Sequence, residues 1–128
     1  MGFQAPRTSP IALVVEDDAD RRALAATLLE ESDYRVVECE TAEDALGAMA
    51  EHGRDVALVF MDVRLPGRMD GVTLAQRVDV QCPHAQLLVT SGAARDGIGA
   101  LPRKSLFMAK PWRPLDLLVR AEEARRAA

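Results

Sequence analysis

The residues of this 128-residue chain that are best suited to chemistry are acids that directly follow apolar segments. Residues 56–61 form an unbroken apolar run, and the carboxylate of Asp62 comes straight after it, ahead of a proline–glycine turn. Glu16 and Asp17 follow a second apolar run, residues 11–15, in the same way. An acid at the end of a buried strand is presented from a rigid support, which is how open α/β sheets build functional sites.

A hydroxyl and an ammonium group end two later apolar segments, at Thr90 and at Lys110. The three acids, if brought within a few ångströms, would raise one another's pKa unless a hard cation lay among them, and Mg²⁺ prefers such oxygen ligands. Beside a bound metal, a carboxylate oxygen of Asp62 can attack a phosphoryl group, while Lys110 offsets charge on the phosphoryl oxygens. These residue types therefore indicate Mg²⁺-assisted phosphoryl transfer to an aspartate.

Alternating strand and helix patterns predict the scaffold that would bring these residues together. Apolar runs predict five strands, over residues 11–15, 34–39, 56–62, 86–90 and 106–109. Helical spacing predicts helices over residues 20–31, 41–53, 72–80 and 114–125. Such alternation implies a parallel sheet covered on both faces and linked by right-handed crossovers. The C-terminal ends of its strands meet at one edge, so we expect the acids, the threonine and the lysine to share one cleft there.

The predicted helices differ in how clearly they are marked. Asp18 is expected to cap the first helix rather than to bind a metal, and Thr41 with Asp44 resembles a capping box at the second. Residues 93–104 contain two glycines, each costing about 1 kcal/mol in a helix interior, and a proline, so the fourth helix should be short or irregular. The apolar spacing predicts six inward-facing side chains in the first and last helices: Leu24, Leu28, Leu29, Leu115, Leu118 and Val119.

Composition argues against several classes of protein. The net charge of −4 at pH 7 and the isoelectric point near 5.2 argue against a nucleic-acid-binding surface, which needs a basic stripe. We see no apolar signal segment and no run long enough to span a membrane, so we expect one cytoplasmic domain without membrane contact. Cys39 and Cys82 form no Cys-x-x-Cys motif and are expected to be free thiols.

Four motifs, each at the end of a predicted strand, together resemble those of a bacterial two-component response regulator receiver domain. They are Val-Val-Glu-Asp-Asp, Met-Asp-Val-Arg-Leu-Pro-Gly, Val-Thr-Ser-Gly and Phe-Met-Ala-Lys-Pro-Trp, in this order along the chain. The resemblance implies a flavodoxin-like, doubly wound, five-stranded parallel sheet with strand order 2-1-3-4-5. On this basis, residues 10–128 are expected to form the receiver domain and residues 1–9 a flexible lead.

The resemblance also implies roles for the residues at the strand ends. Asp62 would be the phosphoacceptor, and Asp17 and Asp62 would bind Mg²⁺ directly. Glu16 would reach the ion mainly through water, and the backbone carbonyl of Arg64 would be a further ligand. Lys110 would offset the charge of the phosphoryl group.

A conformational switch is implied in the same way. Thr90 would hydrogen-bond the new phosphoryl oxygen and pull its loop inward, which lets the ring of Phe107 turn inward. The Lys110–Pro111 bond would be the family's cis peptide. The loop from Asp62 to Gly71 is one residue longer than in the chemotaxis-type receiver.

The function implied is that of a phosphoacceptor and not of a classical enzyme: self-catalysed transfer from a histidine kinase or histidine phosphotransfer protein, followed by slow autodephosphorylation. Output would pass to a partner protein, from a monomer or a phosphorylation-dependent dimer. If the chain is complete, it would act as a single-domain regulator or as a relay or sink for phosphate. Two alternatives stay open: an interaction module that takes no phosphate, and a Mg²⁺-dependent phosphohydrolase, which typically needs an Asp where this chain has Arg64.

Overall fold

The computed structural model describes residues 9–92 and 100–127 and contains a five-stranded parallel sheet. Its strands are ordered β2-β1-β3-β4-β5. This is the order implied by the family resemblance, and it places β3 at the centre of the sheet. The strand bounds are β1 Ile11–Val15, β2 Arg35–Cys39, β3 Val56–Asp62, β4 Gln86–Ser91 and β5 Leu106–Ala109.

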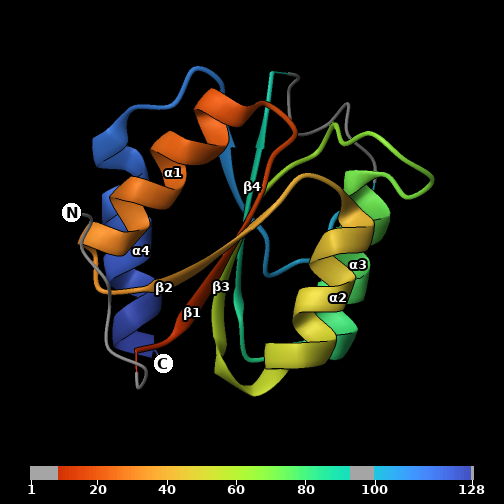
Figure 1. Ribbon diagram of the computed structural model, residues 1–128, viewed down its shortest axis with the longest axis horizontal. Coiled ribbons are helices and arrows are strands. Elements are labelled where there is room, and N and C mark those ends of the chain that lie inside the picture. Colours follow the sequence, from red (N-terminus) through yellow and green to blue (C-terminus); the bar gives the residue numbers. More distant parts are fainter. Residues whose placement is uncertain (1–8, 93–99, 128) are drawn as a thin grey trace.

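Helices cover both faces of the sheet, so the molecule has three layers (Figure 1). On one face lie α1 (Ala19–Glu31) and α4 (Pro114–Ala127). On the other lie α2 (Ala42–His52), which runs into the short 3-10 helix η1 (Gly53–Asp55), and α3 (Gly71–Gln81). Both predicted features, a parallel sheet and cover on both faces, are confirmed.

The central strand β3 is buried along its whole length, which explains why its sequence is apolar without alternation. Its side chains divide between two cores, because successive residues of a strand point to opposite faces. Val59 and Met61 join the core under α2 and α3, whereas Leu58 and Phe60 join the core under α1 and α4. The last residue of β3 is therefore held by an inflexible support.

The expected helix caps at Asp18 and Thr41 are present. The Asp18 carboxylate accepts a hydrogen bond from the Arg21 amide at 2.9 Å, and the Thr41 hydroxyl accepts one from the Asp44 amide at 3.1 Å. The capping box at α2 is modified, because the Asp44 carboxylate accepts a hydrogen bond from the Glu40 amide at 3.3 Å and not from the amide of the cap residue, Thr41.

The predicted orientation of three leucine and valine side chains is wrong. Leu24, Leu115 and Val119 are 47%, 62% and 46% exposed. In α4 the buried stripe consists of Leu117, Ala121 and Ala124, at intervals of four and three residues, and the exposed side chains lie on the opposite side of the helix. In α1 the buried stripe consists of Ala25, Ala26, Leu28 and Leu29, and Leu24 lies at its border. The predicted burial of Leu28 and Leu29 is confirmed.

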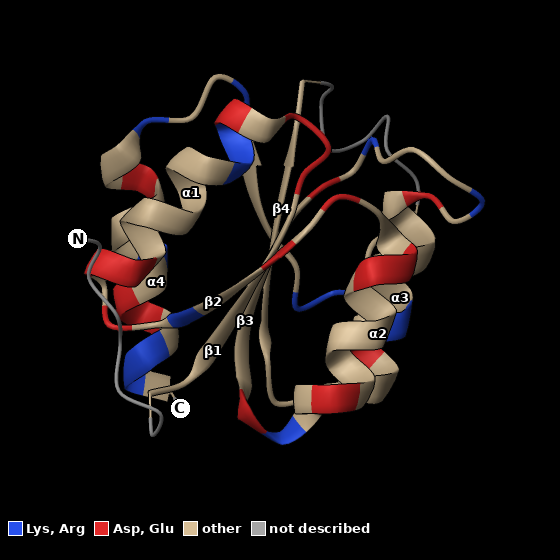
Figure 2. Cartoon of the chain, viewed as in Figure 1, with Lys and Arg blue, Asp and Glu red and all other residues tan. Residues whose placement is uncertain are grey.

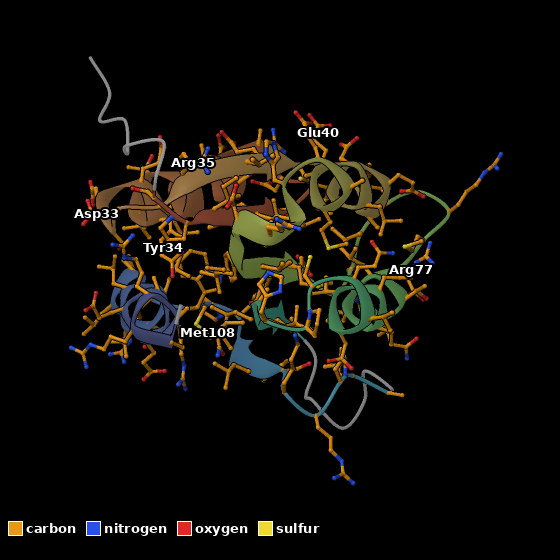
Figure 3. The ribbon with its side chains drawn as sticks, turned by 90° about the horizontal axis from the view of Figure 1, so that it is seen from below. Asp33, Tyr34, Arg35, Glu40, Arg77 and Met108 are labelled. Atoms are coloured by element: carbon orange, nitrogen blue, oxygen red, sulfur yellow. The ribbon has the colours of Figure 1, made fainter. Side chains whose placement is uncertain are left out.

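The end of the sheet remote from Asp62 is closed by a buried tyrosine. Tyr34 precedes β2, and its hydroxyl donates a 2.8 Å hydrogen bond to the Ala121 carbonyl of α4 (Figure 3). Because a buried phenol needs such a partner, this bond ties the start of β2 to the last helix.

Two expectations concern residues that the structure does not describe. The flexible lead is predicted over residues 1–9, of which only Ser9 is described, and the irregular fourth helix over residues 93–104, of which residues 93–99 lie outside the described part of the chain. The described part of that segment, residues 100–104, contains a turn and no helix. Within residues 9–92 and 100–127, no helix has the length and apolar character needed to cross a bilayer.

Candidate functional site

Three acids meet at the C-terminal edge of the sheet. Glu16 and Asp17 lie in the turn between β1 and α1, and Asp62 is the last residue of β3. One carboxylate oxygen from each lies within 4.8 Å of the others. The juxtaposition follows from strand pairing, because Val15 and Met61, the residues just before the acids, are partners in the parallel register. Figure 2 shows the acidic turn between β1 and α1 at this edge.

Asp62 is only 3% exposed, and both of its carboxylate oxygens have partners. Oδ1 accepts a hydrogen bond from the Arg64 amide at 2.9 Å, and Oδ2 binds the ammonium group of Lys110. Lys110 follows β5, and β4 lies between β5 and β3, so the lysine side chain crosses the end of β4 to reach the acid. Its own backbone amide is fixed by the Ser91 carbonyl at 3.0 Å. A negative and a positive group are thus held in contact by three neighbouring strands.

Glu16 is buried, and neighbouring groups hold both of its carboxylate oxygens. Oε2 accepts a hydrogen bond from the Asp18 amide at 3.0 Å, and Oε1 pairs with the Arg21 guanidinium at 3.0 Å. Burial is the largest influence on this acid and raises its pKa, and the nearby Asp62 charge acts in the same direction. The two hydrogen-bond donors oppose that rise, so they help to keep Glu16 ionised.

Arg21 was missed by sequence reasoning, although the chain carries a signal for it. The residue lies in the first turn of the helix capped by Asp18, five positions after Glu16. A helix that starts directly after an acidic turn brings its first-turn side chains back over that turn. Its neighbour Arg22 donates to the Glu16 carbonyl at 3.0 Å and pairs with Glu38 at 3.3 Å, which fixes the turn from the other side.

Thr90 lies beside Asp62, because the two are partners in the register between β3 and β4. The residue is 2% exposed, and among the described residues its hydroxyl oxygen has no hydrogen-bond partner. A buried hydroxyl without a partner costs free energy, so this one is poised to accept a new ligand.

The structure brings Arg64 to the site but not Phe107. Arg64 is exposed and lines a hollow of about 390 Å³ together with Asp62, Gly92 and Lys110. Phe107 is half-buried on β5 and lines a separate hollow against α4. The Lys110–Pro111 bond is cis, as the resemblance implied.

The loop between β3 and α3 is anchored at two glycines. Gly67 has φ of +100°, and a Cβ there would lie 2.9 Å from the Glu43 carboxylate of α2. The same carboxylate accepts a hydrogen bond from the Met69 amide at 3.2 Å. Gly71 opens α3 directly against the backbone of Val63, where a Cβ would overlap main-chain atoms. Both positions therefore need glycine, and the loop is held on both sides.

Comparison with known proteins agrees with this geometry. The family model for the response regulator receiver domain matches residues 12–122. The chain belongs to this receiver family. The match covers β2 to β5 and all of β1 except Ile11, together with the positions of the acids, the threonine and the lysine. The chain thus has the receiver fold and is a receiver domain of the two-component response regulator family.

Two curated relatives of this receiver domain are longer proteins. The chain is 34% identical over 120 residues to the transcriptional regulatory protein AruR of Pseudomonas aeruginosa, covering 88% of this chain and 48% of that protein. It is 33% identical over 117 residues to the nitrogen assimilation regulatory protein NtrX of Azorhizobium caulinodans, covering 88% and 25%. The chain thus spans about half of the first relative's length and a quarter of the second's.

The solved receiver domain of NtrX from Brucella abortus superposes with a TM-score of 0.76 at 30% identity, covering 91% of this receiver and 99% of that chain. A receiver domain protein from Clostridium thermocellum superposes with a TM-score of 0.80 at 19% identity, covering 91% and 94%, and supports the fold alone.

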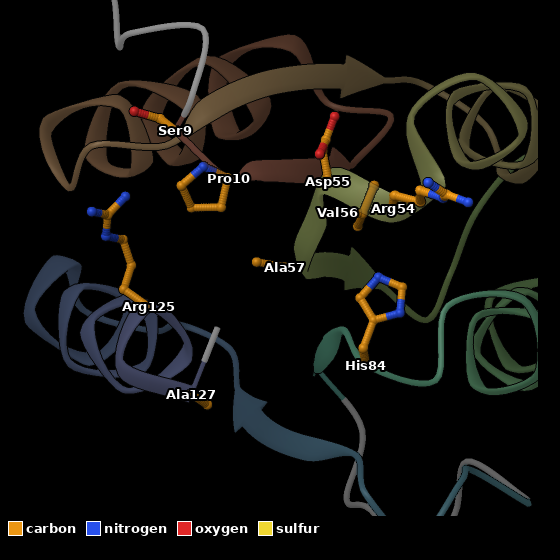
Figure 4. A pocket seen from close by; sticks show the side chains of 9 residues that line it. All are labelled: Ser9, Pro10, Arg54, Asp55, Val56, Ala57, His84, Arg125 and Ala127. Atoms are coloured by element: carbon orange, nitrogen blue, oxygen red, sulfur yellow. The ribbon is translucent and has the colours of Figure 1, made fainter.

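Another hollow lies at the opposite edge of the sheet, where β1 and β3 begin. It has a volume of about 520 Å³ and is lined by residues that include Pro10, Val56, His84 and two arginines. In Figure 4 the side chains of Arg54 and Arg125 extend away from each other and do not converge on a common point. At the edge that holds Asp62, by contrast, three carboxylates and the Lys110 ammonium converge.

Proposed function

We propose that this receiver domain accepts a phosphoryl group on Asp62 from a histidine kinase or a histidine phosphotransfer protein, with Mg²⁺ as cofactor, and signals by a conformational change. The observation that carries the proposal is the buried Asp62 carboxylate, which contacts the Lys110 ammonium and lies within 4.8 Å of two further acids. A carboxylate in such a place has a counter-charge for an incoming phosphate on one side and oxygen ligands for a cation on the other.

The donor set fits Mg²⁺. Glu16, Asp17 and Asp62 supply oxygen atoms only, which suits a hard cation and not a softer one such as zinc in a cysteine site. Asp17 and Asp62 are proposed as direct ligands, with Glu16 acting mainly through water and the Arg64 carbonyl completing the protein's share. When bound, the ion would offset negative charge on the acids and on the transferred group.

The chain's own residues would carry out the transfer. A carboxylate oxygen of Asp62 attacks phosphorus, and the bond from phosphorus to the donor nitrogen breaks with its electron pair passing to the imidazole. The Arg64 amide keeps Oδ1 oriented during the attack. Lys110 is a compact point charge on a flexible stem, so its ammonium can follow charge from the carboxylate to the phosphoryl oxygens.

Thr90 links this chemistry to a change of conformation. Its hydroxyl, which has no partner in the described parts of the chain, would donate to a phosphoryl oxygen on Asp62 and draw the end of β4 toward it. The half-buried Phe107 on the neighbouring strand would then change its packing. We propose Thr90 and Phe107 as the switch. Residues 10–128 would form the receiver domain, and a partner protein, not yet identified, would take up the signal.

The test is phosphorylation by a small donor. Wild-type protein incubated with Mg²⁺ and acetyl phosphate should gain one phosphoryl group by intact-mass spectrometry, and the Asp62→Asn variant should gain none. Asp55→Asn is the matched control, because Asp55 lies just before the other end of the same strand, is exposed, and forms an ion pair with the Arg35 guanidinium at 3.7 Å. The control variant should be labelled like the wild type.

Each outcome has a distinct meaning. An adduct that survives in Asp62→Asn would show that another residue takes the phosphate. No adduct on the wild type, under conditions that label a known receiver, would leave the phosphate-independent interaction module as the better account. Labelling that persists undiminished with excess EDTA would contradict the role of Mg²⁺.

A further inference from the structure

The Arg21 guanidinium sits directly on one of the three clustered acids. Its Nε lies 3.0 Å from Oε1 of Glu16, and the Arg21 side chain is 52% exposed whereas that of Glu16 is 8% exposed. The acid is therefore buried and fixed, while the cation reaches it from the solvent side. The other Glu16 oxygen is held by a backbone amide, so Arg21 is the side chain in this contact that can change its position.

Arg21 and Lys110 approach the acidic cluster from two sides. Lys110 contacts Asp62, Arg21 contacts Glu16, and both cations line one hollow of about 320 Å³ together with Leu24, Pro111 and Trp112. Lys110 has a place in the proposed phosphoryl transfer. Arg21 has none there, although its guanidinium also contacts one of the three acids.

We propose that Arg21 is an internal counter-cation that stabilises the cluster without metal and weakens its affinity for Mg²⁺. The proposal rests on the proposed Mg²⁺ site. A divalent ion bound among the three acids would be repelled by the guanidinium, and a water molecule held by the ion would compete with the guanidinium for the Glu16 carboxylate. Loss of the ion pair is part of the cost of binding metal, so Arg21 sets the concentration at which the site fills.

The size of the effect follows from Coulomb's law. A monovalent and a divalent charge roughly 7 Å apart in a solvent-exposed setting repel enough to change a binding constant by roughly threefold to tenfold, after allowance for salt. Removing the Arg21 charge should therefore tighten Mg²⁺ binding by that factor. Keeping the charge on a different side chain should preserve most of the wild-type affinity.

The experiment compares three variants by isothermal titration calorimetry with MgCl₂, with Trp112 fluorescence as a second readout. Arg21→Gln should bind Mg²⁺ roughly threefold to tenfold more tightly than the wild type, and Arg21→Lys should stay within about twofold. Arg120→Gln is the matched control, because Arg120 also makes an exposed ion pair, 3.2 Å from Glu123, but on α4 away from the cluster. Its Mg²⁺ affinity should equal that of the wild type.

Stability separates this role from simple surface packing. Arg21→Gln should lower the thermal midpoint in EDTA, where the buried acids lose their counter-charge, and the loss should shrink in saturating Mg²⁺. A residue that only packs on the turn would lower both midpoints equally and leave the affinity unchanged.

The outcomes distinguish this inference from the proposed function. Wild-type protein that binds Mg²⁺ with the same affinity as Arg21→Gln overturns the role of Arg21 and leaves the metal site intact. Weaker binding by Arg21→Gln overturns it as well, because the arginine would then assist the metal. Absence of Mg²⁺ binding in the wild type overturns both.

Discussion

Replacing Thr90 by valine should stabilise the unphosphorylated protein. The hydroxyl is 2% exposed and lacks a partner among the described residues, and valine has nearly the same shape without the polar atom. An unsatisfied buried hydroxyl costs about 1 to 3 kcal/mol, so Thr90→Val should raise the free energy of unfolding by about 1 to 2 kcal/mol. For a chain of this length, that corresponds to about 4 °C in the thermal midpoint for each kcal/mol.

The same change should have the opposite effect once the site is loaded. A hydrogen bond to a charged phosphoryl oxygen contributes about 1.5 to 3 kcal/mol, and valine cannot make it. Beryllofluoride with Mg²⁺, a stable mimic of the phosphoryl group, should therefore raise the midpoint of the wild type more than that of Thr90→Val. The free energies come from urea unfolding followed by circular dichroism, with and without the mimic.

The control for Thr90→Val is the same substitution at Thr27, an exposed residue of α1. That variant should differ from the wild type by less than about 0.5 kcal/mol in both conditions. If Thr90→Val destabilises the unloaded protein by 1 kcal/mol or more, roughly the worth of one hydrogen bond, the hydroxyl already has a partner. The argument for a poised switch would then be refuted.

Three further predictions concern the scaffold. Gly71→Ala should destabilise the protein by more than about 2 kcal/mol in chemical unfolding, because the new Cβ would overlap the backbone of the β3–α3 loop. Gly47→Ala is the control and should be neutral or stabilising, because a Cβ at Gly47 would have no atom within 4 Å. Burial raises the pKa of Tyr34 to about 12 from 10.0, so the absorbance of this single tyrosine should titrate late. Because the folded state holds the phenol proton more tightly than the unfolded state, the stability that Tyr34 contributes should be fully present below pH 10 and should be lost as the pH rises toward 12. The free energy of unfolding of Tyr34→Phe should fall less over the same pH range. Cys39 and Cys82 are buried, and burial raises the pKa of both thiols, that of Cys39 to about 12. Neither thiol should therefore react with Ellman's reagent until urea unfolds the chain, and rapid reaction of the native protein would contradict this.

The sheet and most of the site could be predicted because both follow from short-range pattern. A run such as residues 56–61, apolar at every position, fits a strand buried on both faces, and parallel strands bring their C-terminal residues to one edge. Asp62 is the last residue of β3, Thr90 is the last but one of β4, and Lys110 directly follows β5. Their proximity therefore needed no knowledge of side-chain direction.

The features that sequence reasoning missed depend on how each helix is rotated against the sheet. Leu115 and Val119 have suitable spacing for a core, but α4 buries the stripe of Leu117 and two alanines, which lets the helix approach the sheet more closely. The ion pair of Arg21 with Glu16 has the same origin, because only the orientation of α1 decides which first-turn side chain returns over the acidic turn. Periodicity locates a helix well and its rotation poorly.

Charge balance around Asp62 explains why the proposed metal and phosphoryl group should assist one another. Three acids and the two cations Lys110 and Arg21 leave the cluster one negative charge in excess. Mg²⁺ alone would turn this into one positive charge, and phosphorylation alone would make it two negative charges, because a singly charged carboxylate becomes a doubly charged acyl phosphate. The two together leave the cluster neutral, which is the least costly state for groups as buried as Asp62 and Glu16. Each ligand should therefore tighten the binding of the other, and removing the charge of Arg21 should shift that balance toward the metal.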